Sequence, residues 1–301
     1  MTRSKRKKQP RRISDKTSGL RQGQGGARRF RLLAVLGAIA VCGSLAALIT
    51  FLALNAGAGG NSVPKAAIVD QLSLREPNPA FVQSATATLE QAGYVVDYYA
   101  GDQVTVDFYR DLPTHGYKLV IVRGHSAVPR KDLALPADVS SSVLQRVMDA
   151  VGDDVLLFTS EPYNETAHLD EQKELRLFPV VYTGEQTSDS FFAITAGFIT
   201  LSMKGKFNGT TVILMGCSGL ASDRTAAAFV GKGANTVVGW SDTVSSSHTD
   251  AATERLLEHL VIDKLAAQEA VSRTITEVGP DPSYGSTLLG YPSTAAPSLI
   301  R

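Results

Sequence analysis

Short continuous apolar runs recur along the chain from residue 65 onward, separated by polar segments. An apolar run of roughly four to eight residues bounded by turn residues is typical of a strand buried on both faces. The apolar segment 191–203 fits a strand and a helix equally well. The pattern predicts strands over residues 65–72, 94–100, 117–125, 153–161, 175–182, 210–217 and 235–241.

Segments with helical spacing lie between these runs. Residues 78–93 predict a helix, because Asn78 can cap it, Pro79 fits its first turn and Gly93 can end it. A short helix is expected within 105–116, and longer ones over 140–151, 222–234 and 249–268. Strands that alternate with helices predict an α/β three-layer sandwich, with a mostly parallel sheet and helices on both faces.

The amino-terminal part of the chain has a different pattern. Residues 32–54 carry no charged side chain, and about twenty apolar residues are enough to span a bilayer as a helix. Residues 1–31 contain twelve Lys or Arg and one acidic residue, with too few apolar side chains to fold. Because basic flanks stay cytoplasmic, we expect a single-pass plasma-membrane protein with its main domain extracytoplasmic.

The predicted organisation is therefore a basic cytoplasmic arm (1–31), a transmembrane helix (32–54), a linker (55–64) and an α/β ectodomain (65–301). The lipid bilayer is the expected partner of the helix, and membrane topology explains the arm without a nucleic-acid partner. A cleavable signal peptide is the alternative, since "AGA" at 56–58 could be a cleavage site. The apolar region of a signal peptide is typically about 7–15 residues, shorter than this one.

The chain contains two cysteines, and Cys42 lies inside the predicted transmembrane helix. Cys217 is then the lone thiol of the ectodomain, which excludes an intrachain disulfide there. Such a thiol is either a small buried hydrophobe or a reactive group.

Two predicted strands each lead to one side chain with acid–base or nucleophilic chemistry. His125 follows "LVIVRG" and Cys217 follows "TVILMG", so each comes directly after a glycine, Gly124 or Gly216. In an open α/β sheet, sites form at the carboxyl ends of the strands. We expect His125 and Cys217 to share one site if their strands are neighbours.

A cysteine and a histidine together can cleave an acyl bond. The thiol attacks a carbonyl as thiolate and needs a nearby base, and a histidine can then protonate the leaving amine. The developing oxyanion needs N–H donors, for which the amides of Cys217, Gly124 and Ser126 are candidates. This chemistry calls for no metal or other cofactor.

The segments "YKLVIVRGHS", "TTVILMGCSGL" and "AAAFVGKGANTVVGW" resemble the caspase-like cysteine peptidases, a clan that includes gingipains, clostripain, separases and the bacterial CHAT domains. In that pattern a histidine follows one strand and the catalytic cysteine follows the next conserved strand, before a helix and a "VVG" strand. The likeness covers most of 65–295. It implies a caspase-like fold and endopeptidase activity on a peptide or protein substrate.

Carried over residue by residue, the resemblance makes Cys217 the nucleophile and His125 its general base and acid. It places Asp242, or less directly Asp250, in the pocket for the substrate side chain, where an acid implies a preference for Arg or Lys. Trp240 either lines the same pocket or packs in the core.

The chain departs from the family pattern beside both reactive residues. Ser126 stands where the family has glycine, and Gly216 where it often has Ala or Ser. The serious alternative is therefore a caspase-like ectodomain without activity, which binds a peptide or partner in its cleft.

Other interpretations have less support in the sequence. An α/β-hydrolase elbow centred on Ser218 would need glycine where Leu220 stands. His248 could replace His125 as the base. The polar stretch 162–190 could be a self-processing loop, and the oligomeric state stays open. A metal site lacks ligand spacing among the scattered histidines His115, His168, His248 and His259.

Overall fold

The computed structural model describes residues 63–132, 141–181 and 190–292, all within the unit Ser62–Arg301. The basic arm and the predicted transmembrane helix lie outside the described residues. Within the described ranges, no helix is long and apolar enough to cross a membrane.

A six-stranded central sheet organises the fold, in the order β10-β9-β8-β3-β1-β2. Its strands are β1 (Lys65–Asp70), β2 (Val95–Ala100), β3 (Leu119–Arg123), β8 (Thr210–Leu214), β9 (Ala234–Trp240) and β10 (Leu288–Tyr291). Neighbouring strands run parallel from β2 through β9, and β10 pairs antiparallel with β9. This confirms the predicted α/β class with a mostly parallel sheet.

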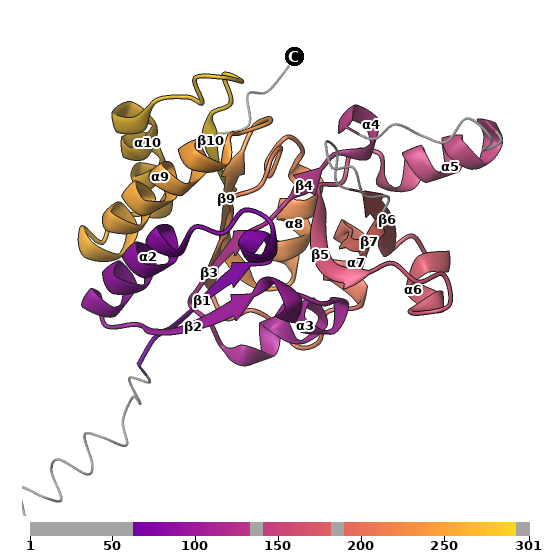
Figure 1. The fold of residues 1–301 in the computed structure, drawn as a ribbon, viewed down its shortest axis with the longest axis horizontal. Helices are drawn as coiled ribbons and strands as arrows, with labels where there is room; N and C mark the ends of the chain where they lie inside the picture. The colour runs from indigo at the N-terminus through magenta and orange to yellow at the C-terminus, as the bar shows by residue number, and fades with distance from the viewer. Residues whose placement is uncertain (1–62, 133–140, 182–189, 293–301) are drawn as a thin grey trace, which may run out of the picture. The chain divides into compact units, whose positions relative to one another are not determined.

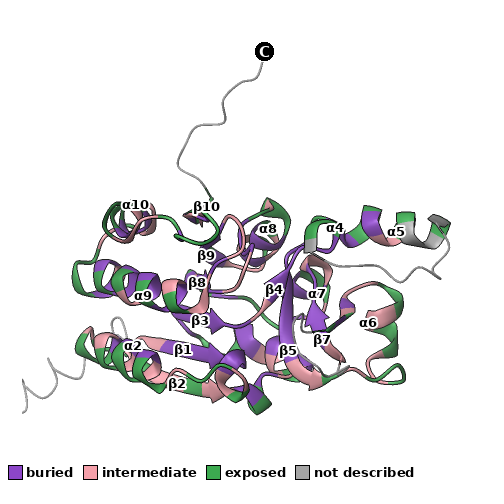
Figure 2. Cartoon of the chain, turned by 45° about the horizontal axis from the view of Figure 1, so that its top comes forward, coloured by how far each residue is buried: buried purple, intermediate pink, exposed green. Residues whose placement is uncertain are grey.

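Helices cover both faces of the central sheet (Figure 1). One face packs on α2 (Pro79–Gln91), α9 (Ser246–Leu257) and α10 (Ala267–Val278), through apolar side chains such as Phe81 and Leu256. The opposite face packs on α3 (Val106–Asp111), α7 (Ala196–Leu201) and α8 (Asp223–Gly231). The inner strands β1, β3, β8 and β9 are mostly buried between these layers, whereas the edge strand β2 has no buried residue, and Figure 2 shows this contrast between β1 and β2.

A second, four-stranded sheet lies between β3 and β8 in the chain, and we call it the small sheet. Its order is β4-β5-β7-β6, and its pairs are antiparallel. The sequence predicted β5 and β6 but not their pairing with β7, which occupies the first half of the ambiguous segment 191–203. The strands are β4 (Ser126–Ala127), β5 (Leu156–Pro162), β6 (Leu177–Val181) and β7 (Ser190–Ile194), accompanied by the helices α4 (Pro129–Asp132), α5 (Ser141–Val151) and α6 (Leu169–Lys173).

The helix predicted over 249–268 is two helices. After α9 the chain makes a π turn over Glu258–Ile262, and Lys264 adopts a left-handed conformation with φ of 56° before α10 begins. A non-glycine residue rarely adopts that conformation, so a continuous helix ends there. Leu260 and Leu265 keep helical spacing in the sequence because both still pack against the same core cluster.

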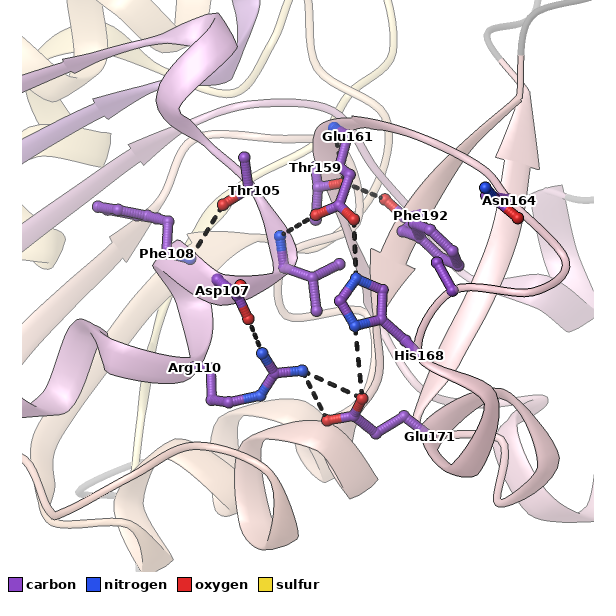
Figure 3. Close-up of polar contacts among 12 residues, drawn as sticks. Thr105, Asp107, Phe108, Arg110, Thr159, Glu161, Asn164, His168, Glu171 and Phe192 are labelled. Carbon is purple, nitrogen blue, oxygen red and sulfur yellow. Dashed lines mark hydrogen bonds and ion pairs between the residues drawn. The ribbon is translucent and has the colours of Figure 1, made fainter.

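A polar cluster joins α6, in the polar stretch 162–190, to α3 (Figure 3). The His168 ring lies 2.7 Å from Glu161, which also accepts the N–H of Val106. Arg110 donates to both carboxylate oxygens of Glu171, at 2.9 and 3.1 Å. The stretch 162–190 is thus ordered over α6 and β6, and its residues 182–189 lie outside the described part.

Candidate active site

The two strands that lead to His125 and Cys217 are direct neighbours in the central sheet. β3 and β8 pair in parallel from Leu119 and Thr211 onward, so both end at the same edge. The pairing continues past the strand end, where the Met215 N–H donates to the Val122 carbonyl at 2.9 Å. The two strands are therefore neighbours, which is the condition that the sequence set for a shared site.

The loops beyond these strands touch each other. The Ser126 hydroxyl donates to the carbonyl oxygen of Cys217 at 2.5 Å. At Gly216 a β-carbon would lie only 2.3 Å from Ser126 Oγ and 2.4 Å from the carbonyl oxygen of Gly124. Only glycine permits this approach, so the residues flanking His125 pack against those flanking Cys217. Both His125 and Cys217 remain partly exposed.

Replacing Gly216 by Ala is expected to separate these loops. The added β-carbon meets a backbone oxygen that cannot rotate away, so overpacking should lower the free energy of unfolding by about 1–3 kcal/mol. Gly231→Ala is the matched control, because nothing lies within 4 Å of its β-carbon position. Urea unfolding of both variants measures the difference, and equal stability would contradict the tight contact.

The backbone of His125 is fixed from two sides. Its N–H donates to Gln71 Oε1 at 3.0 Å, and its carbonyl accepts the N–H of Phe158 on β5 at 3.1 Å. The imidazole lies beside the Phe158 ring, with centroids 6.0 Å apart. The His125 N–H thus already donates a hydrogen bond to Gln71 and is not available to an oxyanion. Of the predicted oxyanion donors, Gly124 and Ser126 are buried, and the amide of Cys217 belongs to a partly exposed residue.

The chain turns sharply just after Cys217. Ser218 adopts the left-handed conformation, with φ of 57°, and its N–H donates to the Asp242 carbonyl at 2.8 Å. Such conformations cost free energy in non-glycine residues and concentrate at functional sites. Ser218 is fully buried, and its hydroxyl has no hydrogen-bond partner among the described residues. No pattern in the sequence predicts this turn.

The Cys217 thiol faces the loop after β9. Its Sγ donates to the Val244 carbonyl at 3.6 Å. Asp281 anchors this loop by accepting hydrogen bonds from the N–H and hydroxyl of Ser245, at 2.9 and 2.5 Å. Burial opposes the Asp281 charge, but these hydrogen bonds and those from Ser283 and Tyr284 outweigh it and lower its pKa to about 2. The anchor therefore stays charged at neutral pH.

Asp242 lies beside the turn after Cys217, as its carbonyl contact with Ser218 shows. Its carboxylate is about half exposed and pairs with Lys131 of α4. The hydrogen bond from Lys131, followed by that from the Thr243 N–H, lowers the pKa of Asp242. A charged carboxylate thus lies at the edge of the candidate site, already paired with a cation of the same chain.

Trp240 and Asp250 do not line a surface pocket. Trp240 ends β9 in the core and is fully buried, and its indole N–H donates to Thr249 Oγ1 at 2.8 Å. Thr249 in turn donates to the Met215 carbonyl at 2.9 Å, just before the Cys217 loop. Asp250 lies in α9 and is 6% exposed. Both residues support the site from inside the protein.

Asp250 belongs to a buried ion network centred on Arg123, which was not predicted from the sequence. Arg123 Nε donates to Asp250 Oδ1 at 2.9 Å, and Arg123 Nη1 donates to Asp70 Oδ1 at 2.9 Å. Asn78 adds a hydrogen bond to Asp250 at 2.8 Å. Burial raises the pKa of Asp70 despite Arg123. The signal in the sequence was a charged residue ending each of two apolar runs, "KAAIVD" and "LVIVR".

The other histidines have local partners away from His125. His248 lies in α9, against the Trp240 ring and 3.3 Å from the Gly279 carbonyl, and His259 lies 2.9 Å from Asp263. His115 lies beside the Tyr99 and Tyr117 rings. No group of three His, Cys, Asp or Glu in the described ranges could hold a metal ion.

Comparison with known proteins gives no family. No protein-family model matches the chain, and no curated protein matches its sequence.

Proposed function

We propose that the protein is a membrane-anchored cysteine endopeptidase of caspase-like type, with Cys217 as nucleophile and His125 as general base and acid. The observation that carries the proposal is the direct contact between the loops after β3 and β8. The Ser126 hydroxyl bonds to the Cys217 carbonyl, and Gly216 packs on Gly124. This contact supports a single site for the two side chains.

The arrangement of elements is compatible with a caspase-like sandwich. The histidine and cysteine strands are adjacent and parallel, and helices flank both faces of the sheet. Helix α8 follows the Cys217 loop and leads into β9, in the order that the family pattern requires. The apolar segment 32–54 and the basic arm support the anchored topology on sequence grounds alone.

The reaction would proceed through an acyl-enzyme. His125 removes the Cys217 proton, and the thiolate forms a C–S bond with the scissile carbonyl. The Cys217 N–H stabilises the oxyanion. His125 then donates its proton to the leaving amine as the C–N bond breaks. Water hydrolyses the thioester, with His125 as base, and regenerates the thiol.

Asp242 would give this site a preference for Arg or Lys before the scissile bond. Its backbone carbonyl contacts the Cys217–Ser218 turn, and its half-exposed carboxylate is charged, so it can bind a substrate cation. A basic substrate side chain must displace Lys131 from Asp242. Exchanging one exposed ion pair for another changes the free energy by about 1 kcal/mol or less, so the displacement is feasible.

The test is hydrolysis of a mixed peptide library by the full chain in detergent. We expect cleavage after Arg or Lys, complete loss in Cys217→Ala, and a weaker basic preference in Asp242→Asn. Asp153→Asn is the matched control, because Asp153 is also an exposed carboxylate paired with a cation, Arg130. Cleavage that persists in Cys217→Ala would rule out the assigned nucleophile.

A binding module without catalysis is the second candidate. The observation that favours it is Ser126, whose buried side chain fills the space that glycine leaves open in the family pattern. Under this alternative, wild-type protein and Cys217→Ala bind the same basic peptides equally and neither cleaves them.

A further inference from the structure

Gln71 is a buried polar residue that contacts the backbone of the candidate base. It directly follows β1 and is 1% exposed. Its Oε1 accepts the N–H of His125 at 3.0 Å, and its Nε2 donates to the Thr159 carbonyl on β5 at 3.5 Å. One side chain thus joins the end of β1, the His125 loop and the small sheet.

Packing brings Gln71 against the same loop. A β-carbon at Gly124 would lie 3.1 Å from Gln71 Cβ and 3.3 Å from Gln71 Oε1. The Gln71 side chain therefore packs on the glycine that precedes His125. A residue larger than glycine at position 124 would push the two apart.

An amide at this buried position needs a reason. Burying a side-chain amide is unfavourable unless its groups are hydrogen-bonded, and an apolar side chain of the same volume would fill the space without that requirement. What the amide adds is an acceptor for the His125 N–H. The Phe158 N–H donates to the His125 carbonyl. The two hydrogen bonds together hold the backbone on both sides of the His125 Cα, from which the imidazole projects.

We propose that Gln71 is a positioning residue that holds His125 in the orientation required to take the proton of Cys217. This inference rests on the proposed function of the His125–Cys217 pair. Gln71 also occupies the His125 N–H, so the oxyanion must use other donors, with the Cys217 amide foremost. Gln71 itself does not touch the substrate.

Two substitutions separate positioning from packing. Gln71→Met keeps the volume and removes the acceptor, so kcat for peptide hydrolysis should fall, by up to about 10²-fold for a misplacement near 1 Å, with KM unchanged. Gln71→Glu keeps the acceptor and should retain most of kcat.

The matched control is Gln103→Met. Gln103 is exposed, and its Oε1 likewise accepts a backbone N–H, that of Ala100, at 3.0 Å. It should leave kcat and the pH profile unchanged. Thermal unfolding of each variant reports whether the fold is intact. If Gln71→Met does not fold, Gln71→Glu decides alone, and a loss of kcat in that variant, which keeps the acceptor, contradicts the proposal.

The pH profile of Cys217 alkylation separates this inference from the proposed function. A low midpoint in the wild type that rises in Gln71→Met supports both. A low midpoint that Gln71→Met leaves unchanged, with kcat unchanged, overturns the role of Gln71 alone. An ordinary thiol profile in the wild type overturns the proposed function and, with it, the role of Gln71.

Discussion

Replacing His125 by Ala is expected to lower kcat/KM for peptide hydrolysis about 10²- to 10⁴-fold, the usual contribution of a general acid–base group. The variant loses both the base that activates Cys217 and the acid that protonates the leaving amine. The backbone contacts to Gln71 and Phe158 do not depend on the imidazole, so the fold should survive. Steady-state kinetics on a basic peptide measure the loss.

His115→Ala is the matched control for this prediction. His115 is exposed and precedes β3, at the opposite end of the strand from His125. The same substitution there should leave kcat/KM unchanged. A His125 variant that retains more than a tenth of the wild-type rate would contradict the assignment. His248, in α9, would then be tested as the alternative base.

Replacing Arg123 by Met is expected to lower the free energy of unfolding by about 3–5 kcal/mol, the cost of removing one partner from a buried ion pair. Asp70 and Asp250 would be left buried, each without its cationic partner. Protonation removes the cost of burying an unpaired negative charge. The difference in the free energy of unfolding between Arg123→Met and the wild type should therefore shrink as the pH falls. Urea unfolding at neutral and mildly acidic pH measures both effects.

Arg130→Met provides the control for this loss. Arg130 pairs with Asp153, and both side chains are more than half exposed. An exposed pair of this kind contributes about 0–1 kcal/mol. If Arg123→Met costs no more than Arg130→Met, the network does not hold the end of β3, and another contact must fix the His125 loop.

The five parallel strands of the central sheet could be predicted because they carry their signal locally, whereas the antiparallel edge strand β10 was not predicted. β1, β3, β8 and β9 are continuous apolar runs, as strands buried on both faces must be. The small sheet was missed as a unit because β5 and β6, which were predicted, pair with strands that have no clear local signal. β4 is only two residues long, and β7 lies in an apolar segment that fits either structure. The break after α9 was hidden because Leu265 continues the apolar spacing.

Within the candidate site, residues that follow a strand could be predicted from the sequence. Residues whose role depends on a partner distant in the chain could not. The apolar runs indicate the two strands that lead to His125 and Cys217, and the pairing of β3 with β8 makes them neighbours. Asp250 resembled a pocket acid in sequence, yet Arg123, distant in the chain, binds it in the core. Gln71 was missed for the same reason, since its hydrogen bond to His125 spans 54 positions.

The most direct test of the central claim is the pH dependence of Cys217 alkylation by iodoacetamide in the full chain. Mass analysis of the Cys217 peptide separates it from Cys42, the other cysteine of the chain. A free thiol titrates near pH 8.5, and an activated one well below that. We predict a midpoint well below 8.5 that returns to about 8.5 in His125→Ala. A midpoint near 8.5 in the wild type, or one that His125→Ala leaves unchanged, would contradict a catalytic pair.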